Sequence, residues 1–141
     1  MKGNLFLTTA ALTLLLACGD DRNKDNVSTD TPSQKIIGTW TIVNKESNGI
    51  NNIAALPCSA LGSFVFSSDK KLQENYNTVV NNNCVTDTDS YMYSVDESNM
   101  RIIATNSQND NVVYAISSLS DKVLILVNTE GTDTTKFTFN K

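Results

Sequence analysis

The feature that most constrains the fold of this chain is an alternation of apolar and polar residues with a period of two, which runs through residues 36–141. Short β-branched or aromatic segments recur there, each bounded by Ser, Asn, Asp or Gly residues that favour turns. Eight strands are expected, at 36–44, 64–66, 72–79, 91–93, 101–104, 112–116, 123–127 and 137–139. No stretch in this region keeps a helical period, so the expected fold class is all-β.

The segments between these strands are short and rich in turn-forming residues. Consecutive strands joined by short turns are typical of an antiparallel up-and-down meander. An open meander would leave two unpaired edges, whereas closure into a barrel pairs them with each other. We therefore expect an eight-stranded antiparallel up-and-down meander closed into a small barrel.

The N-terminus has the pattern of an export signal. Lys2 precedes a 12-residue apolar run at 5–16, which is too short to cross a bilayer of about 30 Å as a helix. The run ends in Leu-Leu-Ala-Cys at 15–18, which resembles the lipobox of bacterial lipoproteins. The alternative is an ordinary cleaved signal with an incidental cysteine. The resemblance implies that residues 1–17 are removed and that acyl chains on Cys18 anchor the protein to a membrane without crossing it.

Residues 18–35 are expected to form the lipidated cysteine and a disordered tether. Between 19 and 35 the only apolar aliphatic residue is Val27, so this segment cannot bury enough surface to offset the entropy of ordering. Asp20 and Asp21 resemble the acidic signal that sends some Bacteroidota lipoproteins to the cell surface, although a solvated acidic linker explains them equally well. The expected location is the cell envelope, lipid-anchored at the outer membrane, with the periplasmic or surface face left open.

Composition excludes several function classes. The chain has no histidine, which removes His-dependent acid–base catalysis. Its 11 Lys and Arg residues against 15 Asp and Glu form no basic cluster, so a nucleic-acid partner is not expected. No metal or other cofactor is expected, and no protein partner is identified. Carboxylates for a hydrolase are available at Glu74, Asp87, Asp96 and Glu97, but nothing in the sequence positions two of them together, so no catalytic residue is assigned.

The stretch 36–42, IIGTWTI, resembles the Gly-x-Trp opening strand of lipocalins, and more closely that of the lipocalin-like domain of many Bacteroidota lipoproteins. The rest of that pattern is matched, in order, by Cys58, 64–66, 68–69, 72–78, Cys84, 122–127 and 136–139. The resemblance covers 36–141 and implies a barrel that binds a small apolar ligand. The chain lacks a clear counterpart of the cation that packs over the lipocalin tryptophan, for which Lys136 is a weak candidate.

Cys58 and Cys84 are the two cysteines that remain after lipidation of Cys18, and an even number in an exported chain favours a disulfide over a metal site. A hairpin turn near Asp69 would bring both cysteines to the open end of that hairpin. We therefore predict a bridge across the second and third strands.

Five aromatic residues are candidates for lining a ligand pocket, namely Trp40, Tyr76, Tyr91, Tyr93 and Tyr114. The alternative is that they fill the core, because eight strands within residues 36–141 make a short barrel. Gly38 is expected to leave room for the indole of Trp40 at one end of the barrel. The two functions that remain are an envelope lipoprotein that binds a small apolar ligand and a non-catalytic structural or interaction scaffold with a filled barrel.

Overall fold

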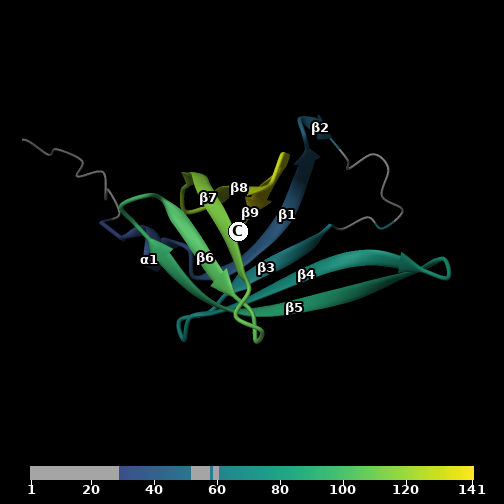
Figure 1. Cartoon of the computed structure of the whole chain (residues 1–141), viewed down its shortest axis with the longest axis horizontal. Helices are drawn as coiled ribbons and strands as arrows, with labels where there is room; N and C mark the ends of the chain where they lie inside the picture. Colours follow the sequence, from purple (N-terminus) through teal and green to yellow (C-terminus); the bar gives the residue numbers. More distant parts are fainter. Residues whose placement is uncertain (1–28, 52–57, 59–60) are drawn as a thin grey trace, which may run out of the picture.

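The computed structural model describes residues 29–51, 58 and 61–141 (Figure 1). The export signal, Cys18 and the tether as far as residue 28 lie outside these described residues, so the sequence-based predictions about them remain predictions. Within the described part, the helical content is too short to provide a membrane-crossing span.

The strands form a closed eight-stranded antiparallel barrel. Strand β1 pairs with β3 on one side and with β9 on the other, which closes the barrel, while β2 is a two-residue addition to β1. The elements are α1 (Pro32–Lys35), β1 (Gly38–Ser47), β2 (Ile50–Asn51), β3 (Gly62–Phe66), β4 (Lys71–Val80), β5 (Asn83–Asp96), β6 (Arg101–Thr105), β7 (Asn111–Leu119), β8 (Val123–Glu130) and β9 (Asp133–Asn140). The predicted fold class is confirmed, and each predicted strand lies within or overlaps one strand of the barrel.

Strand β5 is much longer than the sequence pattern suggests, because it begins at Asn83 rather than near Tyr91. Asn81 and Asn82 form the tight turn before it, both with positive φ, as two-residue hairpin turns require. Beyond the turn, the Oγ1 atoms of Thr86 and Thr88 donate to the side-chain oxygens of Asn77 and Asn75 on β4, each at 2.8 Å. These polar cross-strand pairs extend the hairpin far past the barrel wall (Figure 1).

Helix α1 lies in a segment that the sequence analysis assigned to the disordered tether. Pro32 occupies the first turn, where its missing N–H costs nothing, and the Gln34 side chain accepts a hydrogen bond from the Thr31 N–H at 2.9 Å. Ser33 ties the helix to the barrel, since its N–H and hydroxyl both donate to Glu97 Oε1, at 3.2 and 2.6 Å. The ordered part of the protein therefore begins before residue 36.

The barrel interior is packed with aromatic rings around Phe64. The Phe64 ring lies 4.9–6.4 Å, centroid to centroid, from the rings of Phe66, Tyr76, Tyr114, Phe137 and Phe139. Aliphatic side chains from β6 and β8 complete this core, including Ile102, Leu124 and Leu126. At this level of the barrel the interior is filled.

Candidate functional site

The two ends of the barrel are built differently, and the five predicted aromatic residues are divided between them. We call the end near α1, Gly38 and Lys141 the closed end, and the end at which β1 runs out to Ser47 the open end. Trp40 and Tyr93 belong to the closed end, where both are buried. Tyr114 lies in the core and Tyr76 reaches the open end. Tyr91 is paired with the buried Leu72, packs against the core and also borders a second hollow. The five residues therefore do not share one pocket.

Trp40 seals the closed end. It is fully buried, and its Nε1–H donates to the Ile36 carbonyl oxygen at 2.7 Å. Lys141 covers the ring, with Nζ 4.8 Å from the ring centroid, and donates to the carbonyl oxygens of Ile37 at 2.6 Å and Lys35 at 3.1 Å. This arrangement satisfies the indole N–H and leaves the ring no face for a ligand.

Two expectations about this end are corrected. Lys136 does not cover Trp40, because its ammonium pairs with Glu46 at 3.5 Å, and Lys141 takes that position instead. The space beside Gly38, whose φ is +130°, is occupied by Lys141 rather than by the indole, since a Cβ there would lie 2.7 Å from Lys141 Cε. Lys141 follows the last strand, so no alternation pattern could have indicated its position.

Tyr93 has a structural role at the same end. Its hydroxyl donates to the Ser67 carbonyl oxygen at 3.0 Å, and its ring packs edge-on against Phe66 at 5.2 Å. Lys70 Nζ lies 5.5 Å from the centroid of the Tyr93 ring. Burial raises the pKa of the Tyr93 hydroxyl, which stays a neutral hydrogen-bond donor.

Glu74 is a central residue that the sequence analysis did not place in the interior. It is only 3% exposed, and it accepts hydrogen bonds from the hydroxyls of Tyr114, at 2.7 Å, and Tyr76, at 3.0 Å. Burial raises the pKa of the Glu74 carboxyl, while the two tyrosine hydroxyls oppose that rise. Glu74 is two residues from both Leu72 and Tyr76, so the period of the strand already indicated its inward face.

Above Glu74, a hollow of about 390 Å³ opens at the open end of the barrel. We call it the mouth hollow. Its walls come from strands β1, β4 and β5 and from Leu61, the residue that precedes β3. The lining residues are Ile42, Lys45, Leu61, Tyr76, Asn77, Thr78, Asp87 and Asp89. Apolar and aromatic surface therefore lies beside charged side chains of both signs.

The register of the strands explains which charges face the mouth hollow. A shift in the β1–β9 pairing between Ile42 and Asn44 turns Lys45 inward, opposite Phe137. Lys45 Nζ lies 5.6 Å from the Tyr76 ring centroid and 5.4 Å from that of Phe137. On the facing wall, Asp87 pairs with Tyr76 and Asp89 pairs with Glu74, so both aspartates are on the same face of the hairpin as these two residues, and both are exposed.

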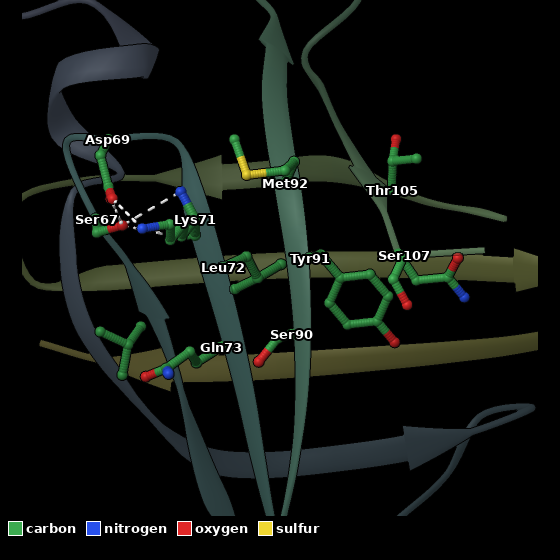
Figure 2. A pocket seen from close by; sticks show the side chains of 12 residues that line it. Ser67, Asp69, Lys71, Leu72, Gln73, Ser90, Tyr91, Met92, Thr105 and Ser107 are labelled. Atoms are coloured by element: carbon green, nitrogen blue, oxygen red, sulfur yellow. Dashed lines mark hydrogen bonds and ion pairs between the residues drawn. The ribbon is translucent and has the colours of Figure 1, made fainter. Parts of the chain in front are cut away.

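A second hollow, of about 520 Å³, lies on the outer side of β3, β4 and β5 (Figure 2). Its floor includes Gln73, Ser90 and Met92, which are exposed on the outward face. Figure 2 shows the Tyr91 ring pointing from β5 toward Ser107, on the loop after β6. This hollow is open to solvent, and Leu72 and Tyr91, which pack in or against the core, also border it.

An ion pair borders one side of this outer hollow. Lys71 Nζ lies 2.6 Å from Asp69 Oδ2, and Ser67 also hydrogen-bonds to Asp69 (Figure 2). Both hydrogen bonds hold the pKa of the exposed Asp69 carboxyl below its ordinary value, that from Lys71 most strongly. These polar groups satisfy one another within the turn between β3 and β4.

The structure separates the carboxylates that the sequence offered for hydrolysis. Glu74 and Asp87 lie toward the open end, whereas Asp96 is the last residue of β5 and Glu97 follows it in the turn before β6. Asp96 accepts hydrogen bonds from Ser98 and Asn99, so both of its carboxylate oxygens already have partners. Among the residues that the structure describes, no group of three His, Cys, Asp or Glu side chains is placed to hold a metal ion.

Cys58 and Cys84 form a disulfide, with their Cα atoms 5.8 Å apart. The predicted pairing is therefore present, but Cys84 lies within β5, the fourth strand of the barrel, rather than just beyond the third. It sits opposite Val79, close to the tip of the β4–β5 hairpin. The bridge thus joins the chain before β3 to the part of the hairpin that projects past the barrel wall.

Comparisons with known proteins agree with the barrel fold. The family model described as "Lipocalin-like domain" matches residues 36–126. Similar solved structures include "Odorant Binding Protein OBP1" (15% identity, 79% of this chain and 75% of that chain, TM-score 0.50) and the bovine lipocalin allergen Bos d 2 (12%, 78% and 75%, TM-score 0.50). At these identities the likeness is one of fold. No curated protein sequence matches the chain.

Proposed function

The chain belongs to the lipocalin-like domain family, and from this we propose that it is a non-catalytic, lipid-anchored protein of the cell envelope that binds a small, largely apolar ligand in the mouth hollow. The observation that carries the binding site is the volume of about 390 Å³ above the aromatic core, which is within the range of small-molecule sites. One similar structure is named as an odorant-binding protein, which supports a small apolar ligand.

The apolar wall of the mouth hollow provides the binding energy in this proposal. Ile42 and Leu61 present aliphatic surface, and Tyr76 adds a ring whose hydroxyl is already held by Glu74. Because that hydroxyl is fixed, the ring keeps its orientation without a ligand. Burying apolar ligand surface against such a wall contributes roughly 25 cal/mol per Å² before the entropic cost of association.

The binding site is tested with the neutral apolar dye N-phenylnaphthylamine. We expect saturable fluorescence enhancement with the purified protein, with buffer lacking protein as the blank. Thr78→Trp should abolish the enhancement, because Thr78 lines the mouth hollow and an indole there fills it. Val79→Trp is the matched control, since Val79 is the next residue of β4, is 40% exposed and does not line the hollow.

A second function competes with ligand binding. The ring cluster around Phe64 fills the barrel interior below the mouth, as a structural or interaction scaffold with a filled barrel requires. If the wild-type protein gives no saturable dye signal, or if Thr78→Trp binds as well as Val79→Trp, the ligand site is wrong and the scaffold is the better explanation.

The lipid anchor is a separate part of the proposal and rests on the Leu-Leu-Ala-Cys boundary at residues 15–18. Radiolabelled palmitate should enter the wild-type protein and should be absent from Cys18→Ala. The variant Cys58→Ala/Cys84→Ala keeps Cys18 and should label normally. Equal labelling of wild type and Cys18→Ala would refute the anchor without affecting the ligand site.

A further inference from the structure

The mouth hollow has an uneven distribution of charge between its walls. Its lining includes the carboxylates of Asp87 and Asp89 on β5 and one ammonium, Lys45, on β1. Glu74, directly opposite Asp89 in the strand register, adds a third carboxyl below them. A ligand that enters here therefore meets more acidic than basic groups.

The two aspartates have little compensation from the protein itself. In the part of the chain that the structure describes, no ion pair includes Asp87 or Asp89. The hydrogen bond to the Asp87 carboxylate comes from Thr78 Oγ1 and is long, at 3.4 Å. The negative charge of Asp89 also contributes to raising the pKa of Glu74, after burial. Both aspartates are exposed, and a cation bound between them would be attracted by both carboxylates.

Lys45 does not supply that positive charge. Its ammonium lies against the rings of Tyr76 and Phe137, 5.6 and 5.4 Å from their centroids, on the wall opposite β5. This position favours the lysine through cation–π attraction and holds it away from the aspartates. The β5 wall is consequently the part of the mouth hollow where a second cation gains most.

We propose that the mouth hollow selects a small amphiphilic amine, with its ammonium group at Asp87 and Asp89 and its apolar part along Ile42 and Leu61. This inference rests on the proposed ligand site, and the cavity with its apolar wall, rather than the aspartates alone, defines that site. An anionic ligand of the same shape would face both carboxylates, and a neutral one would leave their charges unpaired.

The test uses three ligands with the same tail and different head groups: octylamine, octanol and octanoate. Each is titrated against the protein with bound N-phenylnaphthylamine at pH 7, where a primary alkyl amine is protonated because its pKa lies near that of lysine. We expect octylamine to displace the dye at a concentration at least tenfold lower than octanol, and octanoate to be the weakest. Added salt should reduce the advantage of the amine.

Variants show whether the aspartates cause the selectivity. Asp87→Asn/Asp89→Asn should remove the preference, so that octylamine displaces the dye no better than octanol does from the same variant. Glu130→Gln is the matched control, because it removes a carboxylate from the same end of the barrel but outside the hollow, and it should keep the full preference. Thermal unfolding of each variant checks that the fold is retained.

The outcomes separate this inference from the proposed function. Equal displacement by all three ligands, a preference for octanoate, or a preference for octylamine that survives in Asp87→Asn/Asp89→Asn would each overturn the amine selectivity while leaving ligand binding in place. A wild-type protein that binds neither the dye nor any of the three ligands would instead overturn the proposed function, and the amine selectivity with it.

Discussion

At the scale of single residues, Glu74 and Lys141 show how charged side chains are used in a small aromatic barrel. Glu74 is buried, and both of its oxygens accept hydrogen bonds from tyrosine hydroxyls. Burial, followed by the nearby Glu74 charge, raises the pKa values of Tyr76 and Tyr114, so both stay protonated donors. Lys141 reaches back over Trp40 and completes the closed end. Each residue satisfies polar groups that would otherwise destabilise the interior.

Glu74 should make stability fall as pH rises. Because its pKa in the folded protein is raised above the ordinary 4.5, the folded state holds the proton more tightly than the unfolded state. The stabilisation is fully present below about pH 4.5 and is lost as pH rises through the folded pKa. Relative to Glu74→Gln, the unfolding free energy of the wild type should therefore decrease above that pH, by at most about 1.4 kcal/mol per pH unit. Urea unfolding of both proteins across this range measures the difference.

The comparison with Glu74→Gln separates the effect of the Glu74 carboxyl from that of acidic residues whose pKa values are lowered. Hydrogen bonds lower the pKa values of Asp69, Asp96 and Glu97, so these residues lose stabilisation as pH falls, equally in both proteins. A constant difference between wild type and variant above pH 4.5 would contradict the raised pKa of Glu74.

Lys141→Ala should destabilise the closed end. The substitution removes a cation over the Trp40 ring and donors to two carbonyl oxygens, which together are worth about 1–2 kcal/mol. Trp40 is the sole tryptophan, so its fluorescence spectrum should change in the folded variant. Lys122→Ala, which removes the same charge at the same end, should alter neither stability nor the spectrum. If Lys141→Ala has the stability and the fluorescence spectrum of the wild type, the Lys141–Trp40 contact does not stabilise the closed end.

At the scale of elements, the β4–β5 hairpin is the part of the barrel that depends least on a hydrophobic core. Its outer half carries exposed Val79, Val80 and Val85 and is held by threonine–asparagine pairs. The Cys58–Cys84 disulfide attaches this half to the chain before β3. Since Asp87 and Asp89 lie on the same segment of β5, the bridge also supports the charged wall of the mouth hollow.

Removal of the disulfide should lower the unfolding free energy by about 3.5 kcal/mol, the chain-entropy value for a loop of 26 residues. The comparison is between wild type and Cys58→Ser/Cys84→Ser in chemical denaturation. A reductant should destabilise the wild type to the level of the variant and should leave the variant unchanged. If the wild type does not respond to reductant and contains two free thiols, the bridge is absent from the protein as isolated.

At the scale of the whole molecule, the barrel has a closed end, sealed by Trp40 and Lys141, and an open end that contains the mouth hollow. Trp40, Ile36 and Phe64 are fully buried, and none of these three residues lines the mouth hollow. Of the rings around Phe64, Tyr76 is the one that also lines the hollow. The mouth hollow adds Lys45, Asp87 and Asp89, whose charges would destabilise the core if they were buried there without hydrogen-bond partners such as those of Glu74.

This division predicts that stability and binding can be changed separately. Trp40→Ala should cost roughly 3–5 kcal/mol through the cavity that it leaves, while N-phenylnaphthylamine affinity at a temperature where the variant is folded should stay at the wild-type value. Thr78→Trp should show the reverse pattern. A large loss of dye affinity in folded Trp40→Ala would mean that the ligand reaches the closed end and that the two ends are not independent.

Several features could be predicted from the amino-acid sequence, namely the strand order, the closure into a barrel, the buried positions of Trp40 and Ile42 and the pairing of Cys58 with Cys84. These features follow from local information, because the period of two assigns each side chain to a face and short turns leave neighbouring strands little choice of partner. The inward position of Glu74 was not predicted, although its spacing from Leu72 and Tyr76 is the signal that could have indicated it.

Tertiary structure alone decided which distant residues meet. Lys141 reaches Trp40 only because β9 pairs with β1, and the inward turn of Lys45 depends on a register shift in that same pairing. The polar first half of β5 forms a strand because it pairs with β4. Helix α1 is held to the barrel by the hydrogen bond from Ser33 to Glu97, 64 residues away in the sequence. The β1–β9 and Ser33–Glu97 contacts join segments that are far apart in the sequence, and no local pattern of residues indicates which distant segments will meet. These contacts form only when closure of the barrel brings the segments together.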